Sequence, residues 1–282
     1  VTGYGYYQWD PLDWLRLNAG LSYDALRYPL STDLPPLSGD EVSESKWSPK
    51  GAVTIFPWKG GQLRGGYSQS LGGLYFDNSV RLEPAQIGGW TQAYRSLAPE
   101  SVVGLVPGTS FETVGFSFDQ ALKSGTYFGV LVEQLSSDGQ RQVGAFTNGS
   151  PLPIPDTLVA LDESLDFRER TVSAYANQLL GTSWTLGIRG SVSRAELQTR
   201  YPGLPPEAPG MDLLNSDQQA TLSRIQLSAR YQHPRGWFAE GYCTYYHQTN
   251  DGYQPALPGD AFWQQDVFVG FRWPRQLAEI RA

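Results

Sequence analysis

Tight turns marked by aromatic residues alternate along this chain with long polar connections. Tryptophans flank or occupy the tight turns at Pro11–Asp13, Pro57–Gly60 and Pro234–Gly236. Between such turns lie Gly- and Pro-rich stretches of roughly 15 to 40 residues, far above the usual loop length. A soluble sheet has no reason to gather its long loops at one end. A barrel that crosses a membrane has short turns on one rim and favours Trp and Tyr at both interfaces, so the alternation predicts a transmembrane β-barrel.

The composition agrees with strands and turns rather than helices. Of 282 residues, 40% are hydrophobic and 13% aromatic, and 31 are glycine. The apolar runs are too short for a transmembrane helix. The mean hydropathy of −0.36 does not oppose a barrel, because barrel strands need apolar residues only at alternate positions. The net charge of −7 without a basic patch argues against nucleic-acid binding, and the single cysteine, Cys243, excludes an intrachain disulfide.

Alternation of apolar and polar residues predicts eleven strands and part of a twelfth. The expected strands cover about 1–10, 14–25, 47–56, 61–70, 110–120, 126–136, 167–179, 183–198, 219–232, 237–248 and 263–273, with a partial strand over 277–282. Most are longer than soluble strands and match the nine to eleven residues that cross a bilayer. The fold prediction is therefore all-β: an antiparallel transmembrane β-barrel of about 11–12 up-and-down strands, placed in the bacterial outer membrane.

The two faces of these strands favour this prediction over the alternative of a soluble sandwich or lipocalin-like barrel. Charges are spaced singly along the polar faces of consecutive strands, as a polar lumen requires, and aromatics lie near the strand ends, where lipid headgroups would be. The lumen-lining candidates are Arg16, Lys50, Arg64, Glu112, Glu133, Arg189, Glu240 and Arg272. The membrane-interface candidates are Trp9, Trp14, Trp58, Trp237 and Trp273.

The end of the chain indicates a segment of a larger barrel. Leu277–Ala282 has the pattern of a strand that stops partway, and it does not finish on an aromatic residue. Complete bacterial barrels have an even strand number, and an open edge cannot face lipid. We therefore expect 1–282 to be one barrel domain or segment with a long insertion at 71–109. A closed 12-strand barrel with a ragged end is the alternative.

The insertion has two possible placements. Ile87, Trp90, Tyr94 and Leu97 follow a roughly helical spacing. One expectation is a short helix that folds inward and constricts the lumen. The other is a loop that packs on itself outside the barrel.

Several stretches resemble TonB-dependent receptors. Asp10–Asp24 looks like a strand hairpin of these barrels, and Trp47–Val53 with Leu63–Ser70 looks like two of their adjacent strands. Parts of Arg81–Gly104 are similar to receptor-like barrels within large outer-membrane proteins. The resemblance implies a 22-strand barrel, a globular plug inside it and a periplasmic coupling peptide. Only about half the strands and no plug-like segment are recognised, so we expect a partial barrel that acts in transport or as the membrane scaffold of a larger assembly.

The histidines give little support for catalysis. His233 lies beside a tight turn and is expected at an exposed rim. His247 precedes Thr249, Asn250 and Asp251, which permits general-base chemistry in outline, but no serine stands two residues away along the strand. We expect no catalytic site. A small stand-alone porin-like diffusion channel is the first alternative function, and an outer-membrane hydrolase centred on His247 is the second.

Ligand signals are weak as well. The acidic run Asp162–Asp166 is expected in a solvated loop rather than around calcium. Tyr242, Thr244 and Tyr246 share one strand face and could stack a sugar or siderophore. We predict no metal and no cofactor. The expected partners are outer-membrane lipid and lipopolysaccharide, together with remaining barrel or plug segments or other envelope proteins.

Overall fold

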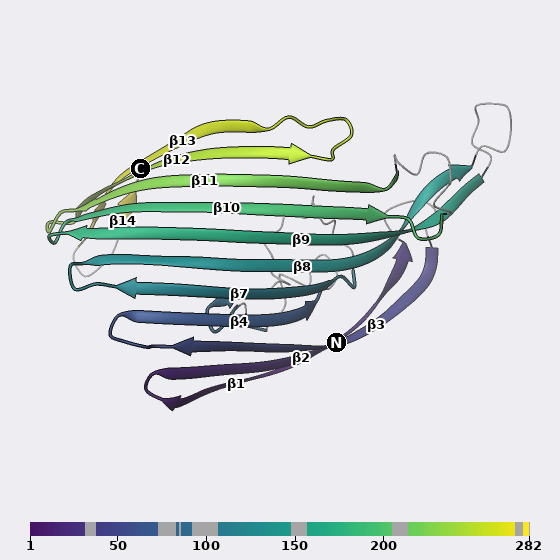
Figure 1. The fold of residues 1–282 in the computed structure, drawn as a ribbon, viewed down its shortest axis with the longest axis horizontal. Coiled ribbons are helices and arrows are strands. Elements are labelled where there is room, and N and C mark those ends of the chain that lie inside the picture. The colour runs from purple at the N-terminus through teal and green to yellow at the C-terminus, as the bar shows by residue number, and fades with distance from the viewer. Residues whose placement is uncertain are drawn as a thin grey trace.

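Twelve strands form one antiparallel sheet in a computed structural model, which describes residues 1–31, 38–72, 83–84, 86–91, 107–147, 157–204, 214–273 and 279–281 (Figure 1). Sequence neighbours are spatial neighbours throughout this sheet. Its strands are β1 (Thr2–Leu12), β2 (Leu15–Ser31), β3 (Ser38–Ile55), β4 (Gly61–Leu71), β7 (Ser110–Ala121), β8 (Thr126–Thr147), β9 (Thr157–Leu180), β10 (Trp184–Arg200), β11 (Ser216–Gln232), β12 (Trp237–Asp251), β13 (Asp260–Arg272) and β14 (Glu279–Arg281). A separate two-stranded hairpin joins β5 (Gln86–Ile87) to β6 (Trp90–Thr91). Within the described ranges, no helix is long and apolar enough to cross a membrane.

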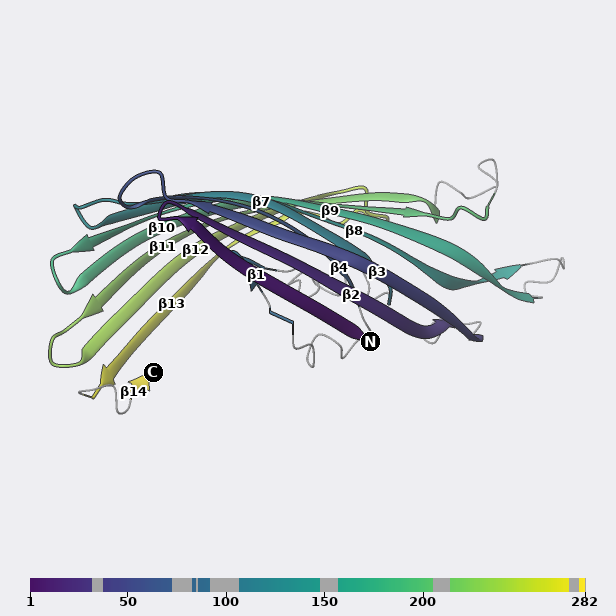
Figure 2. The same ribbon diagram turned by 90° about the horizontal axis from the view of Figure 1, so that it is seen from below.

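The sheet is bent into a trough, with β1 and β14 along its two open edges (Figure 2). We call the inside of the trough the concave face and the outside the convex face. Among the described residues β1 and β14 do not pair, so the sheet stays open. The prediction of an antiparallel, up-and-down barrel architecture is confirmed.

The distribution of side chains is the reverse of that in a soluble protein. The convex face carries large exposed apolar residues, for example Ile188 (49% exposed), Leu227 (50%) and Val267 (73%). The buried residues are mostly polar and lie on the concave face; they include Ser22, Ser48, Lys50, Thr54, Ser68, Ser70, Thr113, Ser117 and Thr244. A soluble sheet buries its apolar face, whereas a membrane barrel turns that face towards lipid.

The prediction of long loops between β2 and β3 and between β8 and β9 is wrong, because the strands continue through most of these two segments. β2 runs to Ser31 and β3 begins at Ser38, and β8 and β9 extend to Thr147 and from Thr157. The acidic run Asp162–Asp166 therefore belongs to β9 and not to a loop. Beyond the membrane neither face of a strand has to be apolar, so the backbone pairs while the alternation of apolar and polar residues disappears.

Glycines form the tight turns at the opposite rim. Gly60, Gly125 and Gly236 have φ angles of 83°, 76° and 98°, in the left-handed region that favours glycine. The turns are closed by short backbone hydrogen bonds, such as Gly236 N to His233 O at 2.9 Å. This rim therefore has the short, ordered turns that the sequence predicts.

Candidate functional site: the polar concave face and the segment inserted into it

Aromatic side chains form two lines on the convex face. On β12, Trp237 and Tyr245 are eight residues apart, and on β13 Phe271 and Trp263 have the same separation. The Trp237 and Phe271 ring centroids lie 5.0 Å apart, and those of Tyr245 and Trp263 lie 4.9 Å apart. Eight residues span about 26 Å of strand, or about 20 Å along the membrane normal at a tilt near 40°. With the width of the rings added, the band approaches the ~25 Å apolar height of outer-membrane barrels.

The line near the long loops also crosses the sheet obliquely. Tyr245 is connected to Ile55 of β3 by residues that stand opposite one another in seven successive strand pairs. The aromatic pair at that end is Tyr23 and Trp47, with centroids 4.7 Å apart, and Trp47 lies eight residues beyond Ile55. The line thus rises about 26 Å over about 34 Å of sheet width, a tilt of about 40°. Outer-membrane barrel strands tilt by about 35–45°.

The predicted interface tryptophans lie at or near the short-turn rim. All five are exposed, between 41% for Trp273 and 57% for Trp237. Trp9 lies on β1 and Trp14 within the β1–β2 turn, and Trp58 donates a 2.6 Å hydrogen bond from Nε1 to Gln120 Oε1. The sequence reasoning missed the second aromatic line, although Trp47 and Trp263 both alternate with polar neighbours. Contact of these rings with lipid headgroups stays a prediction.

Seven of the eight predicted lumen residues share the concave face by strand register. These are Arg16, Lys50, Arg64, Glu133, Arg189, Glu240 and Arg272. Several pair with a carboxylate on a neighbouring strand: Arg16 Nε to Asp10 Oδ1 at 2.8 Å and Arg64 Nη2 to Asp119 Oδ2 at 3.0 Å. That these residues line a closed lumen stays a prediction.

Glu112 is the exception, and its prediction as a concave residue is wrong. It is an even number of residues from Val114 and Phe116, so it shares their convex face. There its carboxylate accepts hydrogen bonds from Tyr67 Oη and Gln69 Nε2, both at 3.1 Å. The period of two along β7 carries this information in the sequence.

The long connection between β4 and β7 returns to the concave face. Backbone hydrogen bonds close its neck, from Gly72 N to Thr109 O at 2.7 Å and from Gly108 N to Gly72 O at 3.1 Å. We call its described part within the trough, Glu83–Pro84 and 86–91, the inner segment. The Glu83 carboxylate pairs with Lys50 Nζ of β3 and accepts a hydrogen bond from Tyr6 Oη of β1. Both side chains of the ion pair are fully buried, so the two charges stabilise each other away from water.

Glycines of the wall make room for the β5–β6 hairpin. Ile87 and Trp90 are each only 4% exposed. A Cβ atom on Gly66 of β4 or Gly115 of β7 would overlap the Trp90 indole. A Cβ on Gly20 of β2 would lie 2.6 Å from the Tyr6 ring and 3.4 Å from Ile87 Cδ1. The missing side chains are therefore what lets the inner segment approach the wall so closely.

The predicted helix in the insertion is wrong for the described residues, while the inward placement is the alternative that the structure bears out. Gly88 and Gly89 have φ angles of 54° and 89°, so the chain turns back there and β5 pairs with β6. An α-helix cannot contain two such residues. Tyr94 and Leu97, and most of the Arg81–Gly104 resemblance, lie outside the described residues.

A second polar region lies on the concave face near the short-turn rim. A cavity of about 440 Å³ opens between β8 and β12, and its lining includes Tyr127, Tyr175, Arg189, Gln226, Arg230 and Tyr242. Tyr175 Oη donates to Asp119 Oδ1 at 2.8 Å, and Arg230 Nη2 donates to Tyr242 Oη at 2.6 Å. The cavity is thus a polar recess with tyrosine and arginine walls.

The predicted ligand-stacking tyrosines do share the concave face, but protein groups already contact them. The Arg230 guanidinium carbon lies 5.7 Å from the centroid of Tyr242, and that of Arg224 lies 5.5 Å from the centroid of Tyr246. Thr244 between them accepts a hydrogen bond from Gln226 Nε2 at 3.1 Å. Stacking of a sugar or siderophore there stays a prediction.

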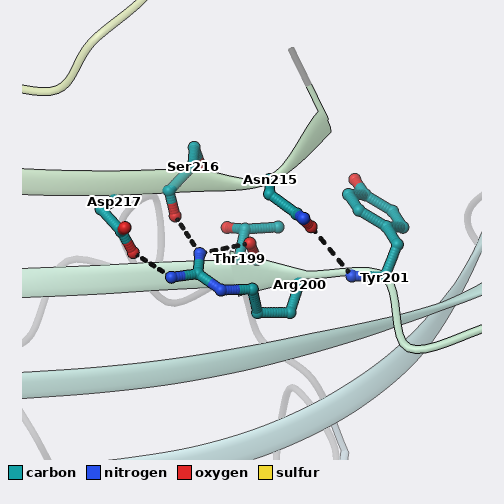
Figure 3. A network of polar contacts seen from close by, with 6 residues as sticks. All are labelled: Thr199, Arg200, Tyr201, Asn215, Ser216 and Asp217. Atoms are coloured by element: carbon teal, nitrogen blue, oxygen red, sulfur yellow. Dashed lines mark hydrogen bonds and ion pairs between the residues drawn. The ribbon is translucent and has the colours of Figure 1, made fainter. Parts of the chain in front are cut away.

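At the long-loop end, polar contacts tie β10 to β11 (Figure 3). Arg200 Nη1 donates to the carbonyls of Thr199 (2.9 Å) and Ser216 (3.0 Å), and its Nη2 lies 2.5 Å from Asp217 Oδ1. The Tyr201 amide donates to Asn215 Oδ1 at 3.3 Å. These bonds hold the ends of the two strands together where the chain leaves the sheet.

Tyr201 also joins a buried carboxylate. Its hydroxyl donates to Glu163 Oε1 at 2.8 Å, and the other Glu163 oxygen pairs with Arg141 Nε of β8. Burial raises the pKa of Tyr201 to about 12, and the neighbouring Glu163 carboxylate acts in the same direction. Glu163, predicted in a solvated loop, is only 5% exposed, because β8 and β9 continue past it.

The histidines form no constellation suited to hydrolysis. His247 is exposed on the convex face of β12, whereas Thr244 lies on the concave face. Asn250 is engaged elsewhere: it accepts from Gln248 Nε2 and donates to Pro258 O. His233 Nδ1 accepts the backbone amide of Arg235 at 3.2 Å within its tight turn. The part of the chain that the structure describes contains no group of three His, Cys, Asp or Glu able to hold a metal.

Comparison with known proteins supports the fold. No family model matches the chain, and no curated protein matches it. Among solved structures, FpvA of P. aeruginosa, bound to a pyoverdine–iron complex, aligns over 97% of this chain with 12% identity and a TM-score of 0.58. The ferric-catecholate import receptor Fiu of E. coli K12 aligns over 95% with 11% identity and a TM-score of 0.55, in both its closed and open forms.

This chain spans less than half the length of each of these structures: 38% of FpvA, and 45% and 49% of the two Fiu forms. At such low identity the likeness shows the fold alone. The open trough, its convex apolar band and these alignments together give one conclusion: the fold is that of a bacterial outer-membrane β-barrel.

Proposed function

We propose that residues 1–282 form one segment of an outer-membrane transport barrel of the TonB-dependent receptor type, with the inner segment narrowing its passage. Further strands or an envelope partner pair with the edges at β1 and β14. Lipid and lipopolysaccharide contact the convex face, and the chain has no catalytic role. In the scaffold version of this proposal, the same barrel segment has no plug and supports a larger assembly without transporting a solute.

The buried ion pair between Glu83 and Lys50 carries the proposal. A loop that merely covered the mouth of a pore would have no need of a desolvated charge pair deep against the wall, since such a pair is costly unless its geometry is maintained. Here the pair joins the inner segment to β3, while Tyr6 adds a contact from β1. The indole of Trp90 in the β5–β6 hairpin fills the space left by Gly66 and Gly115 of the wall. Both features favour an element that regulates passage over an unobstructed pore.

Single-channel conductance of the closed barrel, with residues 1–282 in their full-length protein or together with the partner that pairs with β1 and β14, tests this function in planar bilayers. The variant replaces 73–106 with a short Gly/Ser linker, which keeps the neck residues Gly72 and Gly108. The matched control shortens 148–156, in the β8–β9 connection at the same rim. We expect the insertion variant to conduct several-fold more than the wild type and the control to behave as the wild type.

A porin-like diffusion channel is the alternative, and the same recordings separate the two. Its supporting observation is that charged residues are distributed over the concave faces of strands from β2 to β13. If wild-type protein shows steady open conductance equal to that of the insertion variant, diffusion is favoured and obstruction by the inner segment is refuted. A wild-type protein that stays soluble without detergent, and shows no heat-modifiable gel migration, would contradict the membrane barrel itself.

A further inference from the structure

The convex face of β8, β9 and β10 changes abruptly from apolar to basic. Val132, Val172 and Val192 stand opposite one another on the three strands, and each is 45–50% exposed. Two residues nearer the long loops, the row consists of Gln134, Arg170 and Arg194. The basic row therefore borders the apolar band directly.

Arg170 and Arg194 are paired across β9 and β10, although like charges directly opposite each other destabilise a sheet. Arg168 adds a third positive charge in the next row, opposite Glu196. Arg194 Nε lies 2.7 Å from the Glu196 carboxylate, and Arg170 Nε donates to the neutral Gln134 at 3.1 Å. Within these two rows of β8, β9 and β10, three exposed guanidinium groups face the one carboxylate of Glu196, and the acidic pair of Asp138 and Asp166 lies in the row beyond.

The basic cluster lies at the level of the long-loop aromatic line. That line rises from Tyr245 on β12 by about one residue per strand. The row of Tyr245 crosses β10 at Gly190 and β9 at Ala174. On β10, two strands from β12, the line is therefore shifted by about two residues, to Val192. On β9, three strands from β12, it is shifted by three to four residues, to about Arg170. The guanidinium groups of Arg170 and Arg194 therefore lie where lipid headgroups meet the barrel wall.

Acidic residues follow directly beyond the cluster on the same face. The row beyond Arg168 contains Asp138 opposite Asp166, and the whole chain has a net charge of −7. The cluster is thus not part of a generally basic surface. Short turns face the periplasm in bacterial barrels, so the long-loop rim, and with it the cluster, faces the outer leaflet.

We propose that Arg168, Arg170 and Arg194 bind the phosphate group of an anionic lipid in the outer leaflet. Guanidinium groups match phosphate oxygens through paired, charge-assisted hydrogen bonds. A bound phosphate relieves the repulsion between Arg170 and Arg194. The adjacent valine row lies against the acyl chains of the same lipid. This inference rests on the proposed membrane placement, and it assigns a specific site on the convex face.

Lipid binding to the full chain in detergent, followed by native mass spectrometry, tests the site. The probes are diphosphoryl lipid A and fully dephosphorylated lipid A, with inorganic phosphate as competitor. The variants are Arg170→Gln combined with Arg194→Gln, and Glu196→Gln alone. Arg27→Gln is the matched control, because Arg27 pairs with Glu41 at 2.5 Å on the convex face farther from the membrane.

We expect phosphorylated lipid A to bind the double variant about thirtyfold more weakly than the wild type, or about fivefold for each arginine. Glu196→Gln strengthens binding, and Arg27→Gln leaves it unchanged. Equal binding of phosphorylated and dephosphorylated lipid A by the wild type overturns the proposal. An equal loss in Arg27→Gln does the same. Displacement by an equal concentration of inorganic phosphate would assign the cluster to free phosphate instead of lipid.

Heat-modifiable gel migration of the same samples distinguishes failure of this lipid site from failure of the proposed membrane function. If the wild type migrates as a folded barrel but binds without regard to phosphate, only this site is wrong. If it shows no barrel migration and needs no detergent, the proposed membrane function fails with it.

Discussion

Removing the charge of Glu83 provides the sharpest test of the inner segment. In Glu83→Gln the side chain keeps its shape and can still accept the Tyr6 hydroxyl hydrogen bond, but Lys50 loses the buried charge that it pairs with in the wild type. Both side chains of the pair have zero solvent exposure, so water cannot compensate while the segment stays in place. The inner segment should therefore leave the wall far more often.

The size of the effect follows from burial. Breaking a buried pair by removing one partner costs about 3–5 kcal/mol, which is on the order of 10²- to 5 × 10³-fold in an opening equilibrium. We expect the lower end, because the Tyr6 contact is retained. Lys50→Met combined with Glu83→Leu leaves no uncompensated charge and should largely restore docking. Arg16→Gln breaks the exposed Arg16–Asp10 pair and should cost no more than about 1 kcal/mol.

Hydrogen exchange of the peptide covering 86–91 measures this equilibrium, because these amides exchange when the segment opens. Exchange should be about 10²-fold faster in Glu83→Gln, near wild type in the double variant and unchanged in Arg16→Gln. Wild-type exchange in Glu83→Gln would refute the reasoning, since the segment would then be held without the charge pair. Equal acceleration in Arg16→Gln would instead show that any lost ion pair loosens the barrel.

Three further predictions concern packing, the membrane band and catalysis. Gly66→Ala forces a methyl group into the indole of the inner segment and should weaken docking by about 1–3 kcal/mol in the same exchange experiment. Gly65→Ala, which meets only an ordinary contact at 3.5 Å, should not. Ile188→Arg, in the middle of the convex band, should cost about 2–4 kcal/mol in denaturant unfolding from lipid vesicles, whereas Ser191→Arg on the concave face should cost little. His247→Ala should leave lipase and protease assays unchanged; a measurable activity lost in this variant would contradict the absence of catalysis.

Strand positions within the membrane band were predictable because the environment imposes a period of two there. On β10, Leu186, Ile188 and Val192 alternate with polar residues. The structure places these three on the convex face and the polar residues on the concave face, as the sequence predicts. Beyond the band the same reasoning fails. Residues 137–147 continue β8 beyond the apolar band, where no alternation of apolar and polar residues marks them as strand.

Two errors had signals in the sequence that the reasoning did not use. The spacing of three between Ile87 and Trp90 suits a helix, but it also suits a two-residue turn, and the intervening Gly88–Gly89 favours the turn. Glu112 shares the parity of Val114, which assigns it to the convex face. In both cases local backbone rules were more informative than the chemical type of the residue.

By itself the sequence determined the strand pattern, the polar and apolar faces and the short-turn rim with its tryptophans, because each depends on neighbours along the chain. Only the tertiary structure decided which residues meet across strands. The Arg170–Arg194 pair, the slope of the aromatic line from Tyr245 to Trp47 and the contact of Glu83 with Lys50 join residues 18 or more positions apart. Their registers come from hydrogen bonding between whole strands and from the tilt of the sheet, and no local periodicity contains either quantity.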